Sequence, residues 1–599
     1  MDYKRLGLRV GLEIHQQLNT KHKLFCNCPI KKSTEFPIEV KRRLRAVAGE
    51  LGGFDPAALY EFLRGKSFVY RSDPESSCLI EVDEEPPKLI NMDALKTVIQ
   101  ICKLLNCKIV DEVHVMRKTV IDGSSVSGFQ RTTMIGYDGY LDTSFGKIKI
   151  QTICLEEDAA PALKREGGVV EYRLDRLGIP LVEITTSADN KLPEQAREVA
   201  EKLGLILRST NVQRGIGTIR QDVNISIEEG ARIEIKGFQE LGKIESLISN
   251  EVARQVALLE IKNELKKRGK GDIKTIEATH LFKETKCNFI RRIVEEKGRV
   301  IAVLLQNFAG LLKKQCSDRT FGKELSAYAE AYGYGIIHSD EELDKYQLGF
   351  EFDEMRKEFG SGERDLILIS AGKNPEKAVK AIIERAEHCY IGVPEETRIS
   401  DNSGSKYTRP LPGSERMYPE TDVPSIRIDK KLLDSIEVPK TLLEKGKELE
   451  KELPKEVINQ LIKSKLYSLF EDLRKFNVDP VLIANTLLST AKDLKRKGFA
   501  VEKITKSDWE YLFGLIEKGK ISKNAIPDAL ILITQGKKAE IERQFKQLSD
   551  EELRKIVSET VKNNPEMKES VLMGIIMAKV KGRASGERVS KLLRTMTNN

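Results

Sequence analysis

The sequence predicts an α+β protein of several domains: a mainly antiparallel β-sheet body, an inserted α/β segment and an all-helical C-terminal half. Three observations predict this class. Apolar and polar residues alternate mainly within residues 1–275, helix and strand patterns alternate within 281–395, and residues beyond about 437 follow the 3.6-residue period of helices.

The N-terminal body is predicted from its strands. Apolar and polar side chains alternate at 8–15, 222–227 and 232–236, which indicates half-buried strands. Helix-period stretches lie among them at 91–106, 193–208 and 244–267. The clustering of strands favours antiparallel pairing over a regular βαβ order.

The remaining chain has a different pattern. Residues 281–395 alternate helix and strand, and we expect a compact inserted domain with its own core. The Gly-, Pro- and Ser-rich stretch at 401–424 is typical of either a linker or a functional loop. The charged helical region that follows is punctuated by Pro454, Pro480 and Pro527.

Composition limits the class of protein without identifying it. The net charge of +8, from 100 basic and 92 acidic residues, permits an anionic partner. Nine scattered cysteines indicate a reducing compartment rather than a disulfide framework. We see no signal peptide and no apolar run of about 18 residues, so we expect a cytoplasmic protein without membrane spans.

A first candidate site lies on the N-terminal strand. Glu13 and His15 are two residues apart, so both side chains point to the same polar face. A carboxylate beside an imidazole on a rigid strand can bind a divalent metal. The alternative is an ordinary solvated surface pair.

Two further acidic segments are candidates for the same chemistry. Glu157 lies within an acidic triplet, 156–158, which an oxygen-seeking cation such as Mg²⁺ would neutralise, although a solvated strand end is equally consistent. Glu183 lies inside an apolar strand and needs a partner, either a metal or one of Arg173 and Arg176.

The strand at 218–226 places a row of polar side chains on one face, which is typical of a site floor or of an exposed sheet face. The following segment, 237–243, fits the spacing of a phosphate-binding G-x-x-x-x-G-K loop. However, Ile244 replaces the hydroxyl that such a loop needs for Mg²⁺, so we interpret the segment as a strand-to-helix turn.

Two other patterns remain open. Cys26 and Cys28 form half of a zinc site that Cys78 or His22 could complete, but a second close cysteine pair is missing. The C-terminal residues 577–599 carry six basic side chains against one acid, which fits either a solvated helix or contacts with nucleic-acid phosphates.

Five segments together resemble a known family, the B/E subunits of tRNA-dependent amidotransferases (the GatB/GatE family). They are VGLEIHQQLNTKHKLFCNC (10–28), LEEDAA (155–160) with YRLDRLGIPLVEITTSAD (172–189), GTIRQDVNISI (217–227), RIEIKGFQEL (232–241) and RPLPGSERMYPETDVP (409–424). Their order and spacing agree over nearly the whole chain. The inserted segment resembles that of bacterial-type aspartyl-tRNA synthetases and favours the archaeal E branch. The missing second cysteine pair departs from the B subunits, so we expect no zinc.

The resemblance implies an ATP-dependent ligase that amidates glutamate esterified to tRNA(Gln). ATP would phosphorylate the side-chain carboxylate, and ammonia would then displace the phosphate, with Mg²⁺ at the phosphates. Matching the family's positions, Glu13, His15, Glu157 and Glu183 are the expected catalytic metal ligands. The candidates for contact with nucleotide or substrate are Arg220, Asp222, Asn224 and Lys236. The candidates for tRNA contact are Lys579, Lys581, Arg583, Arg588 and Lys591.

The resemblance also implies a partner and a domain layout. Ammonia would come from an asparaginase-like amidase subunit in a heterodimer or heterotetramer. We expect a catalytic body of 1–280 completed by 396–436, the inserted domain 281–395, a helical domain 437–510 and a tRNA-binding tail 511–599. The alternatives are an amidotransferase that also accepts aspartyl-tRNA(Asn), and a tRNA-binding scaffold without catalysis.

Overall fold

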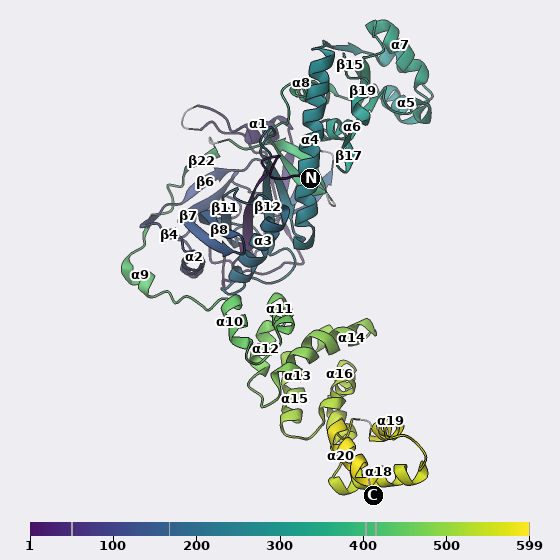
Figure 1. The fold of residues 1–599 in the computed structure, drawn as a ribbon. Coiled ribbons are helices and arrows are strands. Elements are labelled where there is room, and N and C mark those ends of the chain that lie inside the picture. The colour runs from purple at the N-terminus through teal and green to yellow at the C-terminus, as the bar shows by residue number, and fades with distance from the viewer. Residues whose placement is uncertain (50–51, 167, 402–403, 414–415, 581, 598–599) are drawn as a thin grey trace. The chain divides into compact units, whose positions relative to one another are not determined.

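A computed structural model describes residues 1–599, except 50–51, 167, 402–403, 414–415, 581 and 598–599. The described chain divides into two compact units, Met1–Pro439 and Lys440–Asn599 (Figure 1). The first contains every described strand and the second is helical. The predicted α+β class is therefore confirmed. No helix among the described residues is long and apolar enough to cross a membrane.

A large mixed sheet forms the centre of the first unit. Its described strands run in the order β21-β20-β13-β12-β1-β11-β8-β7-β6-β22, with β4 paired to β7. Neighbours are antiparallel except β13 and β20. The bounds are β1 Arg9–Gln17, β4 Lys108–Ile109, β6 Met116–Thr119, β7 Phe129–Thr143, β8 Gly146–Glu157, β11 Pro180–Thr186, β12 Ile219–Ser226, β13 Ile233–Phe238, β20 Glu396–Asp401, β21 Gly404–Pro410 and β22 Met417–Pro419.

Helices cover the apolar face of this sheet. Helix α2 (Met92–Leu104) contacts β7 and β8, α3 (Pro193–Leu207) contacts β1, and α4 (Ile244–Arg268) contacts β12. All three agree with the predicted helices. Because Leu12 and Ile14 point into this core, Glu13 and His15 must point to the other face.

Smaller elements surround the sheet. A second sheet has the order β2-β3-β10-β9 and buries Tyr70 and Tyr172. Its strands are β2 Ile38–Arg42, β3 Ser67–Ser72, β9 Ala162–Glu166 and β10 Val169–Arg173. The short elements nearby are α1 Pro56–Leu63, β5 Glu112–Val113, β23 Ile426–Arg427 and α9 Lys430–Asp434.

The inserted segment supplies three strands of a further sheet, β14-β15-β19-β18, whose first strand β14 precedes the segment in the chain. Helices α5 and α7 cover one face, in a cluster of their own. The other face packs on α6 and α8 in the same buried cluster as the main sheet. The bounds are β14 Ile273–Glu277, α5 Asn288–Glu295, β15 Arg299–Leu305, β16 Gln315–Cys316, β17 Arg319–Thr320, α6 Phe321–Glu330, β18 Ile337–His338, α7 Gly349–Phe359, β19 Leu366–Gly372 and α8 Glu376–His388.

A buried ion network reinforces this junction. Arg398 on β20 is fully buried and bonds Glu324 on α6 at 2.7 Å, while Arg254 on α4 bonds the other oxygen of Glu324 at 3.0 Å. One face of the sheet of the inserted segment thus has a core of its own, while the other face shares the core of the body. The boundaries of 281–395 as a domain remain a prediction.

The second unit is a series of short helices. Its last three, α18, α19 and α20, enclose a small core that includes Leu553, Ile576 and Leu593. The helices are α10 Leu442–Leu449, α11 Lys455–Lys463, α12 Tyr467–Leu473, α13 Pro480–Asn485, α14 Ala491–Arg496, α15 Lys506–Glu517, α16 Ile526–Thr534, α17 Ile541–Phe545, α18 Asp550–Asn563, α19 Glu569–Val580 and α20 Gly586–Thr597. The predicted division at 510–511 stays a prediction.

Candidate functional site

The register of three central strands brings the polar side chains together. His15 on β1 lies opposite Glu183 on β11 and opposite Arg220 on β12, and Glu13 lies opposite Asp222. Side chains of directly paired residues lie on the same face of a sheet. The face away from the helices therefore collects groups that are far apart in sequence.

A first group of candidate ligands consists of Glu13, His15 and Asp222. Nε2 of His15 lies 3.1 Å from Oε1 of Glu13 and 3.7 Å from Oδ2 of Asp222. The ligand atoms of the three residues all lie within 4.8 Å of one another, which is the spacing that a shared cation needs.

A second group shares the same imidazole and adds Glu156 and Glu183. Nδ1 of His15 lies 3.7 Å from Oε2 of Glu183, and the three ligand atoms again lie within 4.8 Å of one another. Lys118 on β6 bridges the carboxylates, at 3.2 Å from Glu156 and 3.3 Å from Glu183. His15 therefore lies between two carboxylate pairs.

The structure brings together three of the four expected metal ligands and leaves Glu157 apart. Its carboxylate accepts a hydrogen bond from the Arg131 backbone at 3.1 Å and lies 3.5 Å from the Arg131 guanidinium. Successive residues of a strand point to opposite faces, and Leu155 points into the core. Glu156 therefore points to the site and Glu157 away from it. Because side chains alternate between the two faces of a strand, the apolar Leu155 would have identified Glu156 from the sequence as the residue that faces the site.

Two lysines and the histidine neutralise the carboxylates. Nζ of Lys236 lies 2.8 Å from Asp222 and 2.7 Å from Glu234. Burial opposes the charged form of His15, but its hydrogen bonds with Asp222 and Glu13 and the charge of Glu183 raise the pKa of His15 to about 10. The carboxylates of this buried site are thus neutralised by neighbouring cationic side chains. Removal of any one of these cations would leave a negative charge without its partner.

The donor set fits a hard divalent cation. Nδ1 of His15 is buried and has no hydrogen-bond partner within the described residues, an unusual condition for a buried nitrogen. Four carboxylates surround this imidazole, and oxygen-rich sites favour Mg²⁺ or Mn²⁺. A ligating imidazole must be neutral, so cation binding would release the His15 proton.

The other predicted nucleotide or substrate residues lie on or beside β12. Arg220 lies 3.6 Å from Asp158, and Lys236 contacts Asp222. Asn224 lies opposite Gly11, one step further along the strand, and belongs to neither ligand group. Asp222 is itself a candidate ligand, a role that the sequence pattern did not identify.

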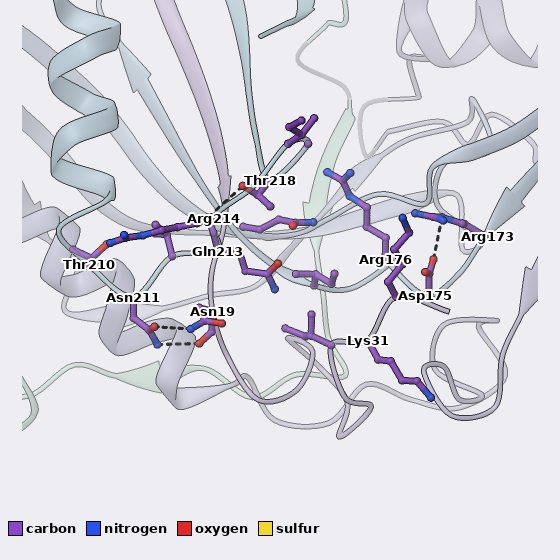
Figure 2. Close-up of a pocket in the computed structure, with 17 residues that line it drawn as sticks. Asn19, Lys31, Arg173, Asp175, Arg176, Thr210, Asn211, Gln213, Arg214 and Thr218 are labelled. Atoms are coloured by element: carbon purple, nitrogen blue, oxygen red, sulfur yellow. Dashed lines mark hydrogen bonds and ion pairs between the residues drawn. The ribbon is translucent and has the colours of Figure 1, made fainter. Parts of the chain in front are cut away.

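Two cavities lie next to the ligand groups. One, of about 470 Å³, is lined by Lys236 and by further basic residues, Arg64, Lys66, Arg165, Lys406 and Arg409. We call it the arginine pocket. The second, of about 710 Å³, is lined by Gln17, by the Arg173–Arg176 turn and by loop residues 210–218, and we call it the loop pocket (Figure 2). Both volumes lie in the range of small-molecule sites.

A second candidate metal centre involves cysteine. The ligand atoms of Cys26, Cys28, Cys78 and Glu81 lie within 4.8 Å of one another. Hydrogen bonds from Cys26 and Cys78 lower the pKa of Cys28 to about 4, so it is a ready thiolate. The argument against zinc depended on a missing second cysteine pair. Cys78 and Glu81 supply the two further donors of a four-donor set, so the missing pair alone no longer excludes zinc, and whether zinc binds stays a prediction.

The basic residues expected to contact tRNA are mostly engaged within the tail. Arg588 bonds Asp550 at 2.6 Å and the Leu548 carbonyl at 3.0 Å. Lys579 donates to Thr560 at 3.0 Å, and Arg583 to the Lys546 carbonyl at 3.4 Å.

Two predicted tail contacts, Lys579 and Lys591, are exposed, and one cannot be described. Lys591 is exposed and borders a groove with three further basic residues, Arg554, Lys562 and Arg588. Lys581 lies outside the described residues. The exposed members of the predicted tRNA-contact set therefore lie on α19 and α20, and their contact with tRNA stays a prediction.

Comparison with known proteins agrees with the resemblance. A family model described as the GatB/GatE catalytic domain matches residues 8–434, and one described as a GatB domain matches 468–596. The E subunit of glutamyl-tRNA(Gln) amidotransferase from Methanocaldococcus jannaschii is 44% identical, with 99% of both chains covered. The proteins of the same name from Archaeoglobus fulgidus and Thermococcus gammatolerans are 40% and 44% identical, each covering 99% of this chain and 98% of their own. The chain belongs to the GatB/GatE family.

Proposed function

We propose that this chain is the tRNA-binding, ATP-using subunit of an amidotransferase that converts glutamyl-tRNA(Gln) into glutaminyl-tRNA(Gln). The names of the full-length relatives support the reaction class. The observation that carries the proposal is the pair of carboxylate groups that share His15 in the middle of the sheet. A scaffold that only binds tRNA has no use for five buried or half-buried ionisable groups at one point.

The reaction needs activation because a carboxylate is a poor electrophile with oxide as its leaving group. A side-chain oxygen of the esterified glutamate attacks the γ-phosphorus of ATP, and ADP leaves. Ammonia then attacks the carboxyl carbon, and phosphate leaves with the original carboxylate oxygen. A bound Mg²⁺ supplies positive charge that screens the phosphates and the incoming carboxylate.

The chain's own residues position and neutralise these groups. Glu13, His15 and Asp222 would hold one cation, and His15, Glu156 and Glu183 a second. Lys236 contacts Asp222 and also lines the arginine pocket, so its ammonium can move from a carboxylate to a phosphate oxygen. We assign ATP to the arginine pocket for this reason, and its cations would bind the triphosphate.

The ammonia source and cellular setting are also part of the proposal. An amidase subunit would hydrolyse an amide donor and pass ammonia to the site, in a heterodimer or heterotetramer. Both steps of tRNA-dependent amide formation belong with cytoplasmic protein synthesis.

The test is ADP formation by the complex with its amidase partner. We expect turnover that requires ATP, a divalent cation and glutamyl-tRNA(Gln). Aspartyl-tRNA(Asn) as the acceptor tests the dual-specificity alternative, and uncharged tRNA(Gln) is the control. A scaffold would form no ADP with any of the three, and that result would exclude catalysis by this subunit.

A further inference from the structure

The loop pocket borders the same sheet face as the ligand groups. Gln17 lines the pocket and lies two residues after His15 on β1, so the two side chains are about 7 Å apart along one face. The Gln17 amide donates to Asp158 at 2.5 Å, and Arg176 of the pocket donates to the same carboxylate at 2.6 Å. The inner end of the pocket therefore lies next to the ligand groups, one step of two residues along β1.

The pocket has little free positive charge in its interior and some at its rim. Three of its five cations are already paired with carboxylates, and these are Lys31, Arg173 and Arg176. The other two, Lys32 and Arg214, are exposed and have no carboxylate partner in the described part of the chain. Two separated rim cations fit a phosphodiester backbone that enters from solvent.

Neutral polar groups line the interior instead. Asn19 and Asn211 from two distant segments bond each other at 3.1 Å, and Gln213 and Thr210 lie beside them (Figure 2). Side-chain amides offer both donors and acceptors, which suits the edges of unpaired bases.

One of the four aliphatic side chains that line this pocket is almost fully exposed. Ile216 is 98% exposed, and it lies between Gly215 and Gly217, whose φ angles of +142° and +82° suit glycine. The two glycines let the loop present Ile216 outward, where the face of a base or ribose can cover it.

The arginine pocket has more basic side chains, although most of them also have carboxylate partners. Seven of its lining residues are basic and three are acidic, and Lys236 connects it to the ligand groups. A triphosphate concentrates several negative charges in one place and needs such a concentration of cations. Most cations of both pockets have carboxylate partners, but the loop pocket has five cations rather than seven and is lined by amide side chains, so it is suited to a different ligand.

We propose that the loop pocket binds the unpaired 3′-terminal nucleotides of the aminoacylated tRNA. This assignment deepens the proposed function and rests on it. Lys32 and Arg214 contact the phosphates, the amides contact base edges, Ile216 packs on a base or ribose face, and the terminal ribose lies at Gln17. The esterified glutamate then extends along the sheet toward His15, while ATP approaches from the arginine pocket.

The binding test compares two RNA hairpins, one with a short unpaired 3′ tail and one blunt, with the intact complex. We expect the wild type to prefer the tailed hairpin. The double variant Lys32→Ala/Arg214→Ala should lose this preference, and the slope of log affinity against log salt should fall by about 1.4, roughly 0.7 for each phosphate contact on a single strand. Ile216→Ser should reduce the preference without changing the slope.

The matched control is Lys96→Ala/Lys191→Ala, two exposed lysines outside both pockets without carboxylate partners in the described chain, and it should bind as wild type. Equal binding of the two hairpins by the wild type, or an unchanged preference in the double variant, would overturn the proposal. A double variant with a raised KM for ATP and an unchanged KM for glutamyl-tRNA would also overturn the proposal. If the wild type forms no ADP at all, the proposed function fails, while the hairpin comparison still decides what the pocket binds.

Discussion

The body and the tail carry their charges in different ways. In the body, His15 and Glu156 are 5% and 1% exposed, and they lie among further buried carboxylates. In the tail, the Asp550 side chain that pairs with Arg588 is 80% exposed, and Lys591 is exposed as well. Burying an ionised group costs several kcal/mol unless it is well paired, whereas exposed pairs contribute about 0–1 kcal/mol.

This difference indicates where function constrains the sequence. Buried carboxylates that lie close together repel one another unless a cation neutralises them. Nδ1 of His15, which has no hydrogen-bond partner among the described residues, marks the position where a bound cation would do so. Exposed charges in the tail need no such compensation. We therefore expect large, specific effects from substitutions in the body and small, salt-dependent effects from substitutions in the tail.

The largest effect is expected at the acidic pair on β8 and β11. Glu156→Gln and Glu183→Gln should each lower kcat for ADP formation by at least about 10², because each removes a charge at the reacting centre. Glu157→Gln should change kcat much less, since Glu157 contacts Arg131 on the other face. Steady-state kinetics with glutamyl-tRNA(Gln) measure both. A larger loss in Glu157→Gln than in Glu156→Gln would show that the sequence-based assignment was correct.

The buried network of the body should give the largest stability effect. Arg254→Met leaves Glu251 and Glu324 without this partner in a buried site, and we expect a loss of about 3–5 kcal/mol in the free energy of unfolding. The control is Arg197→Met, which breaks part-exposed pairs with Glu201 and Glu245 and should cost about 1 kcal/mol or less. Urea titration compares the two. Equal losses would contradict the contrast between buried and exposed charges.

The cysteine centre tests whether the body needs a structural metal. We expect about one equivalent of zinc in the purified chain, since three thiols and a carboxylate form a four-coordinate donor set. Cys28→Ser should reduce the zinc content and the melting temperature, whereas Cys107→Ser, outside the group, should change neither. Elemental analysis of the wild type is the first measurement, because it shows whether zinc is bound. A chain that contains no zinc would support the expectation drawn from the missing second cysteine pair.

The tail should show the smallest effects, of two separable kinds. Lys591→Ala removes a candidate phosphate contact, so KM for tRNA should rise a few-fold and the salt slope of binding should fall by about 1, with kcat unchanged. Arg588→Ala breaks bonds between helix α20 and the start of α18, and it should destabilise the tail by about 1 kcal/mol. If Lys591→Ala lowered kcat instead, the tail would belong to the catalytic machinery.

The same contrast explains what could be predicted from sequence. The apolar alternation at Leu12 and Ile14 predicted both the strand and the direction of Glu13 and His15, because a two-residue period leaves one choice of face. Helices with strong periods, such as α4, were predicted to within a residue or two. The family resemblance supplied the reaction.

The rest depended on contacts between distant segments, which no local pattern records. Glu156 and Lys118 become neighbours only through the register of β6, β7 and β8. Glu81 completes the cysteine group from a turn three residues after Cys78, where a search for cysteine pairs could not find it. Arg588, which the basic pattern predicts as a phosphate contact, bonds Asp550 of another helix, and the local sequence does not record that contact.

The central claim is that this protein activates the glutamate side chain by phosphorylation. It is tested most directly with glutamyl-tRNA(Gln) carrying ¹⁸O in the side-chain carboxylate, the intact complex, ATP and an ammonia donor. The account predicts that one ¹⁸O appears in the phosphate released for each amide formed, and that Glu183→Gln abolishes the transfer. Phosphate without the label, in a reaction that still produces glutaminyl-tRNA, would contradict it.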